Sequence, residues 1–353
     1  MRALTTGAIL APNWLGDVIM SLPAVSALLA ATPERSWTVL ARPGVANIYG
    51  MARLPLQVEP LPHRRSLPRL AGAKATRELV IFPNSFHAAL LGLRLGARRR
   101  VGYARDRRGW LLKPAVPVPV PGSLPAHESF YYLELLRRAG LVAELPAEDP
   151  VRLRVPLYPD PSRVQRWRRK LVPATPGADT GHIAALHVGA SGGTAKCWLP
   201  ERFAELAGEL SRRGVSVVIV GGNAERELAR KIRMLAPHPE QIKNLAGETS
   251  LEDLVALIAA VDVLVANDSG PMHVAGAVGT PVVALFGPTN EKATYPLAEA
   301  GKLRLVTAAG VACRPCKLHE CPIDHRCMGN ISVAQVRAEV DAVLWADKKV
   351  TRR

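Results

Sequence analysis

The feature that most constrains the fold is the stretch 261–290, VDVLVANDSGPMHVAGAVGTPVVALFGPTN. Residues 261–266 form a short apolar, β-branched run, which is typical of a parallel strand buried on both faces. A polar turn follows at 267–270, and Pro271 comes next, where the first turn of a helix tolerates a missing amide. Small residues lead to a second apolar strand at 281–286. The stretch therefore predicts a strand, a turn, a closely packed helix and a strand, and the free amides at the helix start would attract a phosphate.

Apolar runs of this kind alternate with helix-length segments along the chain. This alternation predicts an α/β fold with two successive doubly wound parallel sheets. A Pro-, Arg- and Gly-rich segment at 155–181 indicates a domain boundary near its end. We expect domains at 1–175 and 176–335, then a C-terminal helix and basic tail at 336–353. Strands are expected at residues 3–11, 37–41, 79–82, 100–103, 183–188, 215–221, 242–245, 261–266, 281–286 and 303–307.

Most of the formal net charge of +16 lies in the first half of the chain. Residues 1–177 contain 26 Lys and Arg against 11 Asp and Glu, a net +15, whereas the remaining residues contain 20 against 19, a net +1. Such an excess points to nucleic acid, anionic lipid or a phosphorylated substrate, and a solvated basic face is the alternative. The candidate contacts are Arg98, Arg99, Arg100, Arg105, Arg107, Arg108, Arg163, Arg166, Arg168, Arg169 and Lys170.

Three other features exclude broad classes of protein. Polar and helix-breaking residues near the N-terminus interrupt any signal-peptide core. The uncharged stretch 269–290 contains four glycines and three prolines, so it is a poor membrane helix. Five cysteines, an odd number, argue against a disulfide framework. We expect a soluble, cytoplasmic protein.

Asp17 is the first candidate for chemistry. It follows the first expected strand and precedes the first expected helix, at the edge of a parallel sheet where ligands bind. A carboxylate there could act as a general base toward an incoming hydroxyl. Aspartate is also common in the first turn of any helix. The position leaves both interpretations open.

A second candidate is the loop 187–196, HVGASGGTAK, after the first strand of the second expected sheet. Ser191 and Thr194 offer hydroxyls and Lys196 offers a charge, which together suit a diphosphate. The spacing is not that of a Walker P-loop, and a flexible loop with an exposed lysine is the alternative.

The third candidate is the turn in the opening stretch, where Asp268, Ser269, Gly270 and His273 stand together. An ordinary cap and a core histidine would account for the same residues. However, this turn and the Lys196 loop both follow strands of one parallel sheet, so both lie at its carboxyl edge. We therefore expect them to form one anion-binding site.

A cysteine-rich segment comes late in the chain, with Cys313, Cys316, Cys321 and Cys327 and with His319 and His325 nearby. Four cysteines could hold zinc, but the spacing is a weak match to common zinc modules. Reduced thiols are the favoured interpretation.

Several motifs occur in an order that resembles a known family. They are NWLGDV at 13–18, KCWLP at 196–200, NDSGPMH at 267–273, FGPT at 286–289 and the late pattern from Cys316 to Met328. Together they resemble the ADP-heptose:lipopolysaccharide heptosyltransferases, which form glycosyltransferase family nine, over nearly the whole chain. The cysteine pattern and the loop before Lys196 are more similar to the heptosyltransferase II branch than to the heptosyltransferase I branch.

The resemblance implies a GT-B fold, with two Rossmann-like domains facing across a cleft. The N-terminal domain would bind the acceptor and the C-terminal domain the nucleotide sugar. Asp17 would be the catalytic base and Lys196 would contact the donor phosphates. Asp268, Ser269, Gly270 and His273 would bind the donor, with Ser191 and Thr194 beside them and Glu225 on the ribose.

The implied reaction is an inverting transfer of L-glycero-D-manno-heptose from ADP-heptose to the first heptose of the lipopolysaccharide inner core. It requires no metal or other cofactor. The acceptor is anionic and bound to lipid, so the enzyme would sit on the cytoplasmic face of the inner membrane, with Asn13, Arg105 and Arg107 as acceptor contacts. The alternatives are heptosyltransferase I activity, another GT-B enzyme, or a basic nucleic-acid-binding protein. Against the last, aromatic residues are only 5% and no nucleic-acid-binding motif occurs.

Overall fold

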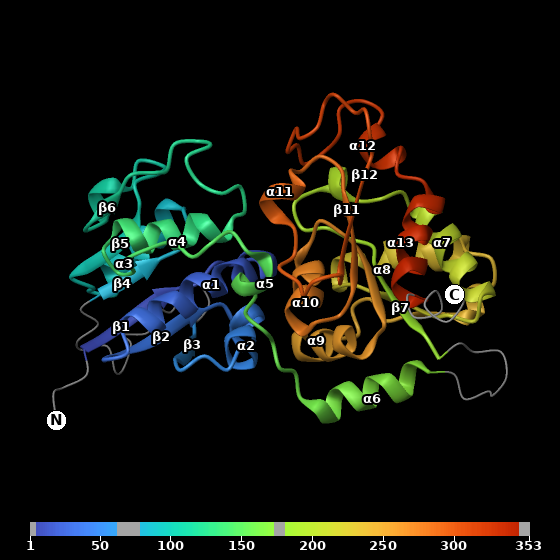
Figure 1. Ribbon diagram of the computed structural model, residues 1–353, viewed down its shortest axis with the longest axis horizontal. Helices are drawn as coiled ribbons and strands as arrows, with labels where there is room; N and C mark the ends of the chain where they lie inside the picture. Colours follow the sequence, from blue (N-terminus) through green and yellow to red (C-terminus); the bar gives the residue numbers. More distant parts are fainter. Residues whose placement is uncertain (1–4, 62–77, 173–180, 346–353) are drawn as a thin grey trace, which may run out of the picture. The chain divides into compact units, whose positions relative to one another are not determined.

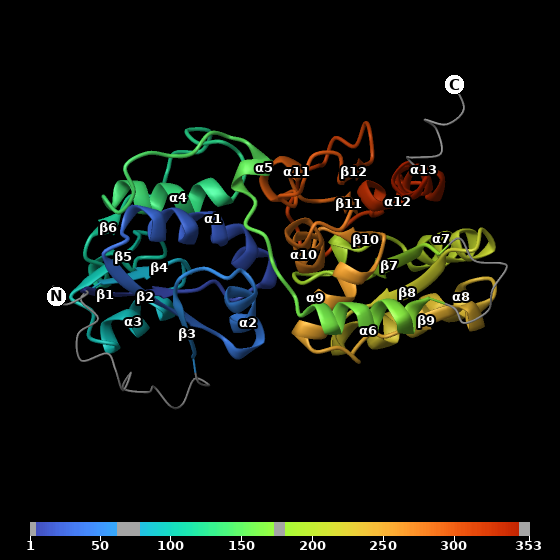
Figure 2. The same ribbon diagram turned by 60° about the horizontal axis from the view of Figure 1, so that its bottom comes forward.

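Two six-stranded sheets organise the chain, one in each of two compact units, Met1–Leu157 and Tyr158–Arg353. The structure is a computed structural model, and it describes residues 5–61, 78–172 and 181–345 (Figures 1 and 2). The strands named below pair in parallel within each sheet. The expected fold class, α/β with two doubly wound sheets, is confirmed.

The first sheet has the strand order β3-β2-β1-β4-β5-β6. Helices α1 and α4 pack against each other, and Figure 2 shows them on the face of the sheet opposite to α3. The strands are β1 (Thr5–Leu10), β2 (Arg35–Ala41), β3 (Gln57–Pro60), β4 (Glu78–Ile81), β5 (Arg99–Tyr103) and β6 (Ala115–Val116). The helices are α1 (Leu15–Ala31), α2 (Pro43–Met51), α3 (Phe86–Arg94), η1 (Gly109–Leu111), α4 (Ser129–Arg138) and α5 (Pro150–Leu153).

The second sheet has the order β12-β11-β10-β7-β8-β9. Its strands are β7 (Ile183–His187), β8 (Ser216–Val220), β9 (Ile242–Asn244), β10 (Val263–Asn267), β11 (Val282–Phe286) and β12 (Leu303–Thr307). Its helices are α6 (Pro161–Leu171), η2 (Thr194–Lys196), α7 (Pro200–Arg212), η3 (Asn223–Glu225), α8 (Arg226–Leu235), η4 (Pro239–Gln241), α9 (Leu251–Ala260), α10 (Gly270–Val278), α11 (Glu291–Thr294), α12 (Arg326–Gly329) and α13 (Val333–Leu344). No helix in the three described ranges is long and apolar enough to cross a membrane.

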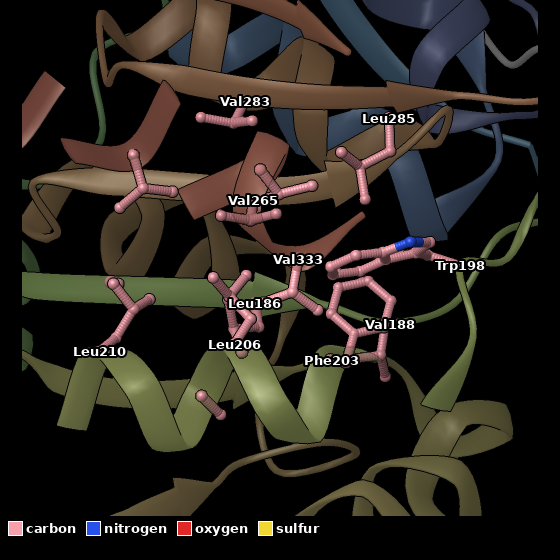
Figure 3. Packing of buried hydrophobic residues seen from close by; sticks show 14 of the residues in the cluster. Leu186, Val188, Trp198, Phe203, Leu206, Leu210, Val265, Val283, Leu285 and Val333 are labelled. Atoms are coloured by element: carbon pink, nitrogen blue, oxygen red, sulfur yellow. The ribbon is translucent and has the colours of Figure 1, made fainter. Parts of the chain in front are cut away.

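The core of the second unit forms where α7 and α13 cover one face of the sheet (Figure 3). Strands β7, β10 and β11 are buried along their whole length, which explains why their sequences are continuous apolar runs. Phe203, Leu206 and Leu210 lie on one stripe of α7 and are fully buried. The Trp198 ring meets Phe203 edge-on, with 5.0 Å between the ring centroids.

Helix α6 belongs to the second unit, although the sequence places it in the first domain. It packs against α9, where one carboxylate oxygen of Asp253 accepts hydrogen bonds from Arg163 at 3.1 Å and Arg166 at 2.8 Å. Arg168 pairs with Asp262 at 2.8 Å. The predicted boundary between residues 175 and 176 lies outside the described residues. Proline-rich sequence flanks α6 on both sides, so composition does not show to which unit the helix belongs. Its contacts with α9 and Asp262 place it in the second unit.

The expected C-terminal helix is also an integral part of the second unit. Helix α13 starts at Val333, and its side chains Val336 and Val340 are fully buried in the shared core. The predicted basic tail extends beyond residue 345 and lies outside the described residues.

Replacing Leu206 with Ala tests this core. The substitution removes buried methyl groups and leaves a cavity, so we expect the second unit to lose about 2–5 kcal/mol of unfolding free energy. Urea denaturation followed by far-UV circular dichroism measures the loss. Leu235→Ala is the matched control, because Leu235 is exposed at the end of α8, and its effect should stay within about 0.5 kcal/mol. Equal effects of the two substitutions would contradict this account of the core.

Candidate active site

Strands β7 and β10 are neighbours at the centre of the second sheet, where the strand order reverses. Ligands bind outside the carboxyl ends of the strands at such a switch point in open parallel sheets. The segments that follow these two strands are residues 188–196 and 268–270, the two for which the sequence predicts anion binding. The fold therefore brings both predicted segments to one edge.

Asn267, the last residue of β10, joins the two segments. Its carboxamide is fully buried and donates to the carbonyl oxygens of Val188 at 3.0 Å and Gly189 at 3.1 Å. The amide oxygen accepts from the backbone N–H of Trp198 at 3.0 Å. Three backbone groups of the loop after β7 are thus satisfied by one side chain of β10.

Asp268 and Lys196 form an ion pair at this edge. Asp268 Oδ2 lies 2.9 Å from Lys196 Nζ, and Asp268 Oδ1 accepts from Thr294 Oγ1 at 3.4 Å. The carboxylate is buried, whereas a quarter of the lysine side chain is exposed. The ammonium group is therefore held by a buried carboxylate while part of the lysine side chain is exposed, so a phosphate could reach it.

The Ser269 hydroxyl is held by a buried histidine. It donates to the Asn267 carbonyl at 2.9 Å and lies 3.1 Å from Nδ1 of His187, at the end of β7. The tautomer of the imidazole decides whether Nδ1 donates to this hydroxyl or accepts from it. Burial lowers the pKa of His187 to about 4, so the ring is neutral at pH 7. Ser269 precedes α10 without capping it through its side chain, and Gly270 is the first residue of that helix.

His273 and Glu225 occupy different parts of this edge. His273 is buried on α10, one turn beyond its start. Glu225 accepts from the backbone N–H of Gly222 at 2.6 Å, beyond the end of β8. A Cβ atom at Gly189 would lie 2.3 Å from Glu225 Cγ, so the carboxylate chain rests against the loop after β7.

The cysteine-rich segment supports the Lys196 loop. The backbone N–H of Ala195 donates to the His319 carbonyl at 3.0 Å, and His325 Nε2 lies 2.7 Å from the Ala195 carbonyl oxygen. Gly193 has φ 111°, and a Cβ atom there would lie 2.1 Å from the His319 carbonyl oxygen. Only glycine fits this close approach. Ser191 and Thr194 are exposed on the same loop.

The cysteines themselves carry free thiols. Burial, followed by the neighbouring Cys313, Cys321 and Cys316, raises the pKa of Cys327. Within the described residues, no group of three or more His, Cys, Asp or Glu has an arrangement that could hold a metal ion.

In the first unit, Asp17 lies in the first turn of α1, after β1 and beside the point where that strand order reverses. It is half-buried, and Asn13 and Trp14 before it are exposed. Its charge is one of the causes, after burial, that raise the pKa of Tyr132 on α4. The position of Asp17 at a sheet switch point agrees with the sequence expectation, and its role as a base stays a prediction.

The basic residues of the first unit divide into exposed and buried groups. Arg105 and Arg107 are exposed, as an acceptor contact requires, and Arg105 lies 3.9 Å from the Asp106 carboxylate. Arg108 is fully buried and donates to the Tyr103 carbonyl at 3.0 Å and the Ser85 carbonyl at 3.1 Å. The expectation that Arg108 meets an acceptor or a lipid is therefore wrong, because its guanidinium is used inside the unit.

Comparison with protein families matches residues 65–326 to glycosyltransferase family 9 (heptosyltransferase). The chain belongs to glycosyltransferase family 9. This family 9 chain is 30% identical to lipopolysaccharide heptosyltransferase 2 of Salmonella typhimurium over 318 residues, which cover 85% of this chain and 88% of that protein. It is also 30% identical to lipopolysaccharide heptosyltransferase 2 of Escherichia coli over 322 residues, covering 85% and 88%.

Solved structures support the same assignment. The structure of E. coli ADP-heptose lps heptosyltransferase II matches with a TM-score of 0.77 and 26% identity, covering 98% of this chain and all of that one. E. coli heptosyltransferase WaaC with ADP shares the fold, with a TM-score of 0.65 and 18% identity over 95% of this chain and 99% of that one. The GT-B prediction is confirmed, and this family 9 chain is a glycosyltransferase.

Three residues of this family 9 site have contacts that the sequence did not predict. Asn267 joins the two loops, His187 holds Ser269, and Thr294 contacts Asp268. Asn267 and His187 are each the polar last residue of an otherwise apolar strand, and this position is the feature from which a role at the sheet edge could have been predicted. Thr294 comes from α11, and nothing in its local sequence marks it.

The buried His187 predicts a pH dependence of stability. Its pKa is about 4 in the folded chain against an ordinary 6.5, so between these values the unfolded chain binds more protons than the folded chain. Stability contributed by this group is present above pH 6.5 and falls by up to about 3 kcal/mol toward pH 4. Urea denaturation of wild type and His187→Asn, which keeps a hydrogen-bonding side chain beside Ser269, measures this pH dependence. The gap between the two stability curves should change across this range, and parallel curves would contradict the assignment.

Proposed function

We propose that the chain transfers L-glycero-D-manno-heptose from ADP-heptose to the first heptose of the lipopolysaccharide inner core, with inversion at the anomeric carbon. The observation that carries this proposal is the similarity to two lipopolysaccharide heptosyltransferases 2 over 85% of the chain. The acceptor would be a heptosyl-Kdo-lipid A.

On the donor side, negative charge grows on the leaving ADP as the glycosidic bond breaks. Lys196 would meet that charge, with the Ser191 and Thr194 hydroxyls and the amides near Ser269 and Gly270 beside it. The ion pair with Asp268 supports this role, because it fixes the ammonium group before the donor arrives. Asp268 and His273 would contact the donor, and Glu225 would bind the ribose. These groups supply the charge stabilisation from the chain itself, so we propose that the reaction requires no metal or other cofactor.

On the acceptor side, Asp17 would accept the proton of the attacking hydroxyl as that oxygen bonds to the anomeric carbon. Attack from the face opposite to ADP gives inversion in one step. Asn13, Arg105 and Arg107 would contact the phosphorylated acceptor. Because that acceptor is anchored in lipid, we propose that the protein works at the cytoplasmic face of the inner membrane as a peripheral enzyme.

The deciding experiment offers ADP-heptose with heptosyl-Kdo-lipid A and, in parallel, with Kdo-lipid A that lacks heptose. Transfer to the first acceptor supports the proposal, and preference for the second assigns heptosyltransferase I activity instead. UDP- and GDP-sugars test the donor, and an excess of EDTA should leave the rate unchanged. Absence of transfer from ADP-heptose to either acceptor would refute the proposal.

Replacing Asp17 with Asn tests the base. The amide keeps the size of the side chain but takes up no proton, so kcat should fall by about 10²- to 10⁴-fold. The Kd for ADP, measured by isothermal titration calorimetry, should stay within about twofold. Full turnover by this variant would exclude Asp17 as the base.

Replacing Lys196 with Met tests the phosphate contact. The variant loses the charge that stabilises the leaving group, so kcat/KM should fall by about 10²- to 10³-fold, with weaker ADP binding. Lys196→Arg keeps a cation beside Asp268 and should retain more activity than Lys196→Met. If the two variants behave alike while both stay folded, the charge is not the determinant.

A further inference from the structure

An aromatic pair lies on the surface of the first unit without any role in its core. Phe86, the first residue of α3, and Trp110 of η1 have ring centroids 6.2 Å apart, although 43% of Phe86 and 73% of Trp110 is exposed. Leu93 lies two turns along α3 on the same side and is 43% exposed. Exposed apolar side chains gathered in this way indicate a binding surface rather than random scatter.

Buried hydrogen bonds hold this pair in place. The Arg108 guanidinium donates to the Tyr103 carbonyl at the end of β5 and to the Ser85 carbonyl at the start of α3. A further bond reaches the Asn84 side chain at 3.3 Å. Arg108 therefore ties the loop that precedes Phe86 to the loop that precedes Trp110. The two rings are presented at the surface by a fixed scaffold, so their exposure is not a consequence of a loose loop.

The chain segment that carries the pair is rich in cations. Residues 79–127 contain eight Lys and Arg and one acidic residue, Asp106. Those of the eight that are exposed are Arg94, Arg98, Arg105, Arg107 and Lys113. Aromatic rings flanked by exposed cations are the combination that binds the interface of an anionic bilayer, where the rings enter the headgroup region and the cations meet lipid phosphates.

We propose that the surface formed by Phe86, Leu93 and Trp110, with Arg94 and Arg98, docks the protein on an anionic lipid bilayer. This inference rests on the proposed function, because an acceptor anchored in lipid requires an enzyme that approaches the membrane. The aromatic pair follows β4 and β5, at the same carboxyl edge of the sheet as Asp17. Leu93, Arg94 and Arg98 lie toward the other end of α3, so the surface runs along this helix away from that edge. Docking through the end that carries Phe86 and Trp110 brings the edge with Asp17 close to the headgroups from which the acceptor projects.

The test measures co-sedimentation of the full chain with vesicles of phosphatidylcholine alone and of phosphatidylcholine mixed with phosphatidylglycerol, both without acceptor. Wild type should bind the mixed vesicles and lose that binding at high salt. Phe86→Ala with Trp110→Ala should weaken binding by about tenfold or more, since two ring burials are lost. Arg94→Gln with Arg98→Gln should weaken it less and reduce its dependence on salt.

Two controls separate docking from general effects. Met234→Ala with Leu235→Ala removes apolar side chains of similar exposure, 65% and 46%, from α8 of the second unit and should leave vesicle binding unchanged. Thermal unfolding midpoints of all variants should stay close to wild type, because the replaced side chains are exposed. Equal loss of vesicle binding in the α8 control would overturn the proposal.

A second assay distinguishes a lipid surface from a sugar platform. With an acceptor saccharide freed of its acyl chains, the Phe86→Ala, Trp110→Ala variant should keep the wild-type KM, while its rate on acceptor embedded in vesicles falls. A raised KM for the free saccharide with unchanged vesicle binding would assign the pair to sugar stacking and overturn the proposal. Vesicle binding is measured without donor or acceptor, so failure of the proposed transfer reaction does not affect this result.

Discussion

The candidate site of the second unit depends on the buried carboxamide of Asn267. It satisfies three backbone groups in the loop after β7, and a buried backbone group without a partner costs about 1–3 kcal/mol. By fixing the N–H of Trp198, this side chain fixes the residues just before it, including Lys196. Asp268 and Ser269 follow Asn267 directly. One amide therefore sets the relative position of the two segments that form the candidate site.

Much of the fold followed from local patterns. The continuous apolar runs at residues 183–188, 261–266 and 281–286 predict strands buried on both faces, and β7, β10 and β11 are buried throughout. Parallel pairing then places whatever follows those strands at one edge, which is why Lys196 and Asp268 could be expected together from sequence. Two strands gave no such signal. β3 is a largely exposed edge strand of four residues, and β6 has only two.

The remaining features arise from contacts between residues far apart in the chain, which local patterns do not encode. Arginine-rich sequence predicts an exposed basic face equally for Arg107 and Arg108, yet one is exposed and the other is fully buried among carbonyl groups. In the same way, the composition around α6 is typical of a linker. The contacts of this helix with Asp253 and Asp262 attach it to the second unit, and they are not visible in the local sequence. The sequence indicates only that His187 ends a strand. Its contact with Ser269 forms because β7 and β10 are neighbours in the sheet.

The contact between Gly193 and His319 limits which sequence changes this fold tolerates. The carbonyl of His319 occupies the space that any side chain at residue 193 would need, and His325 closes on the same loop across 130 positions of sequence. An insertion or deletion in the cysteine-bearing segment would therefore shift the backbone beneath Lys196. A chimaera that takes residues 189–200 from one relative and residues 311–328 from another would combine two segments that do not fit each other. Recombination between relatives should therefore be tolerated best when both segments come from the same parent.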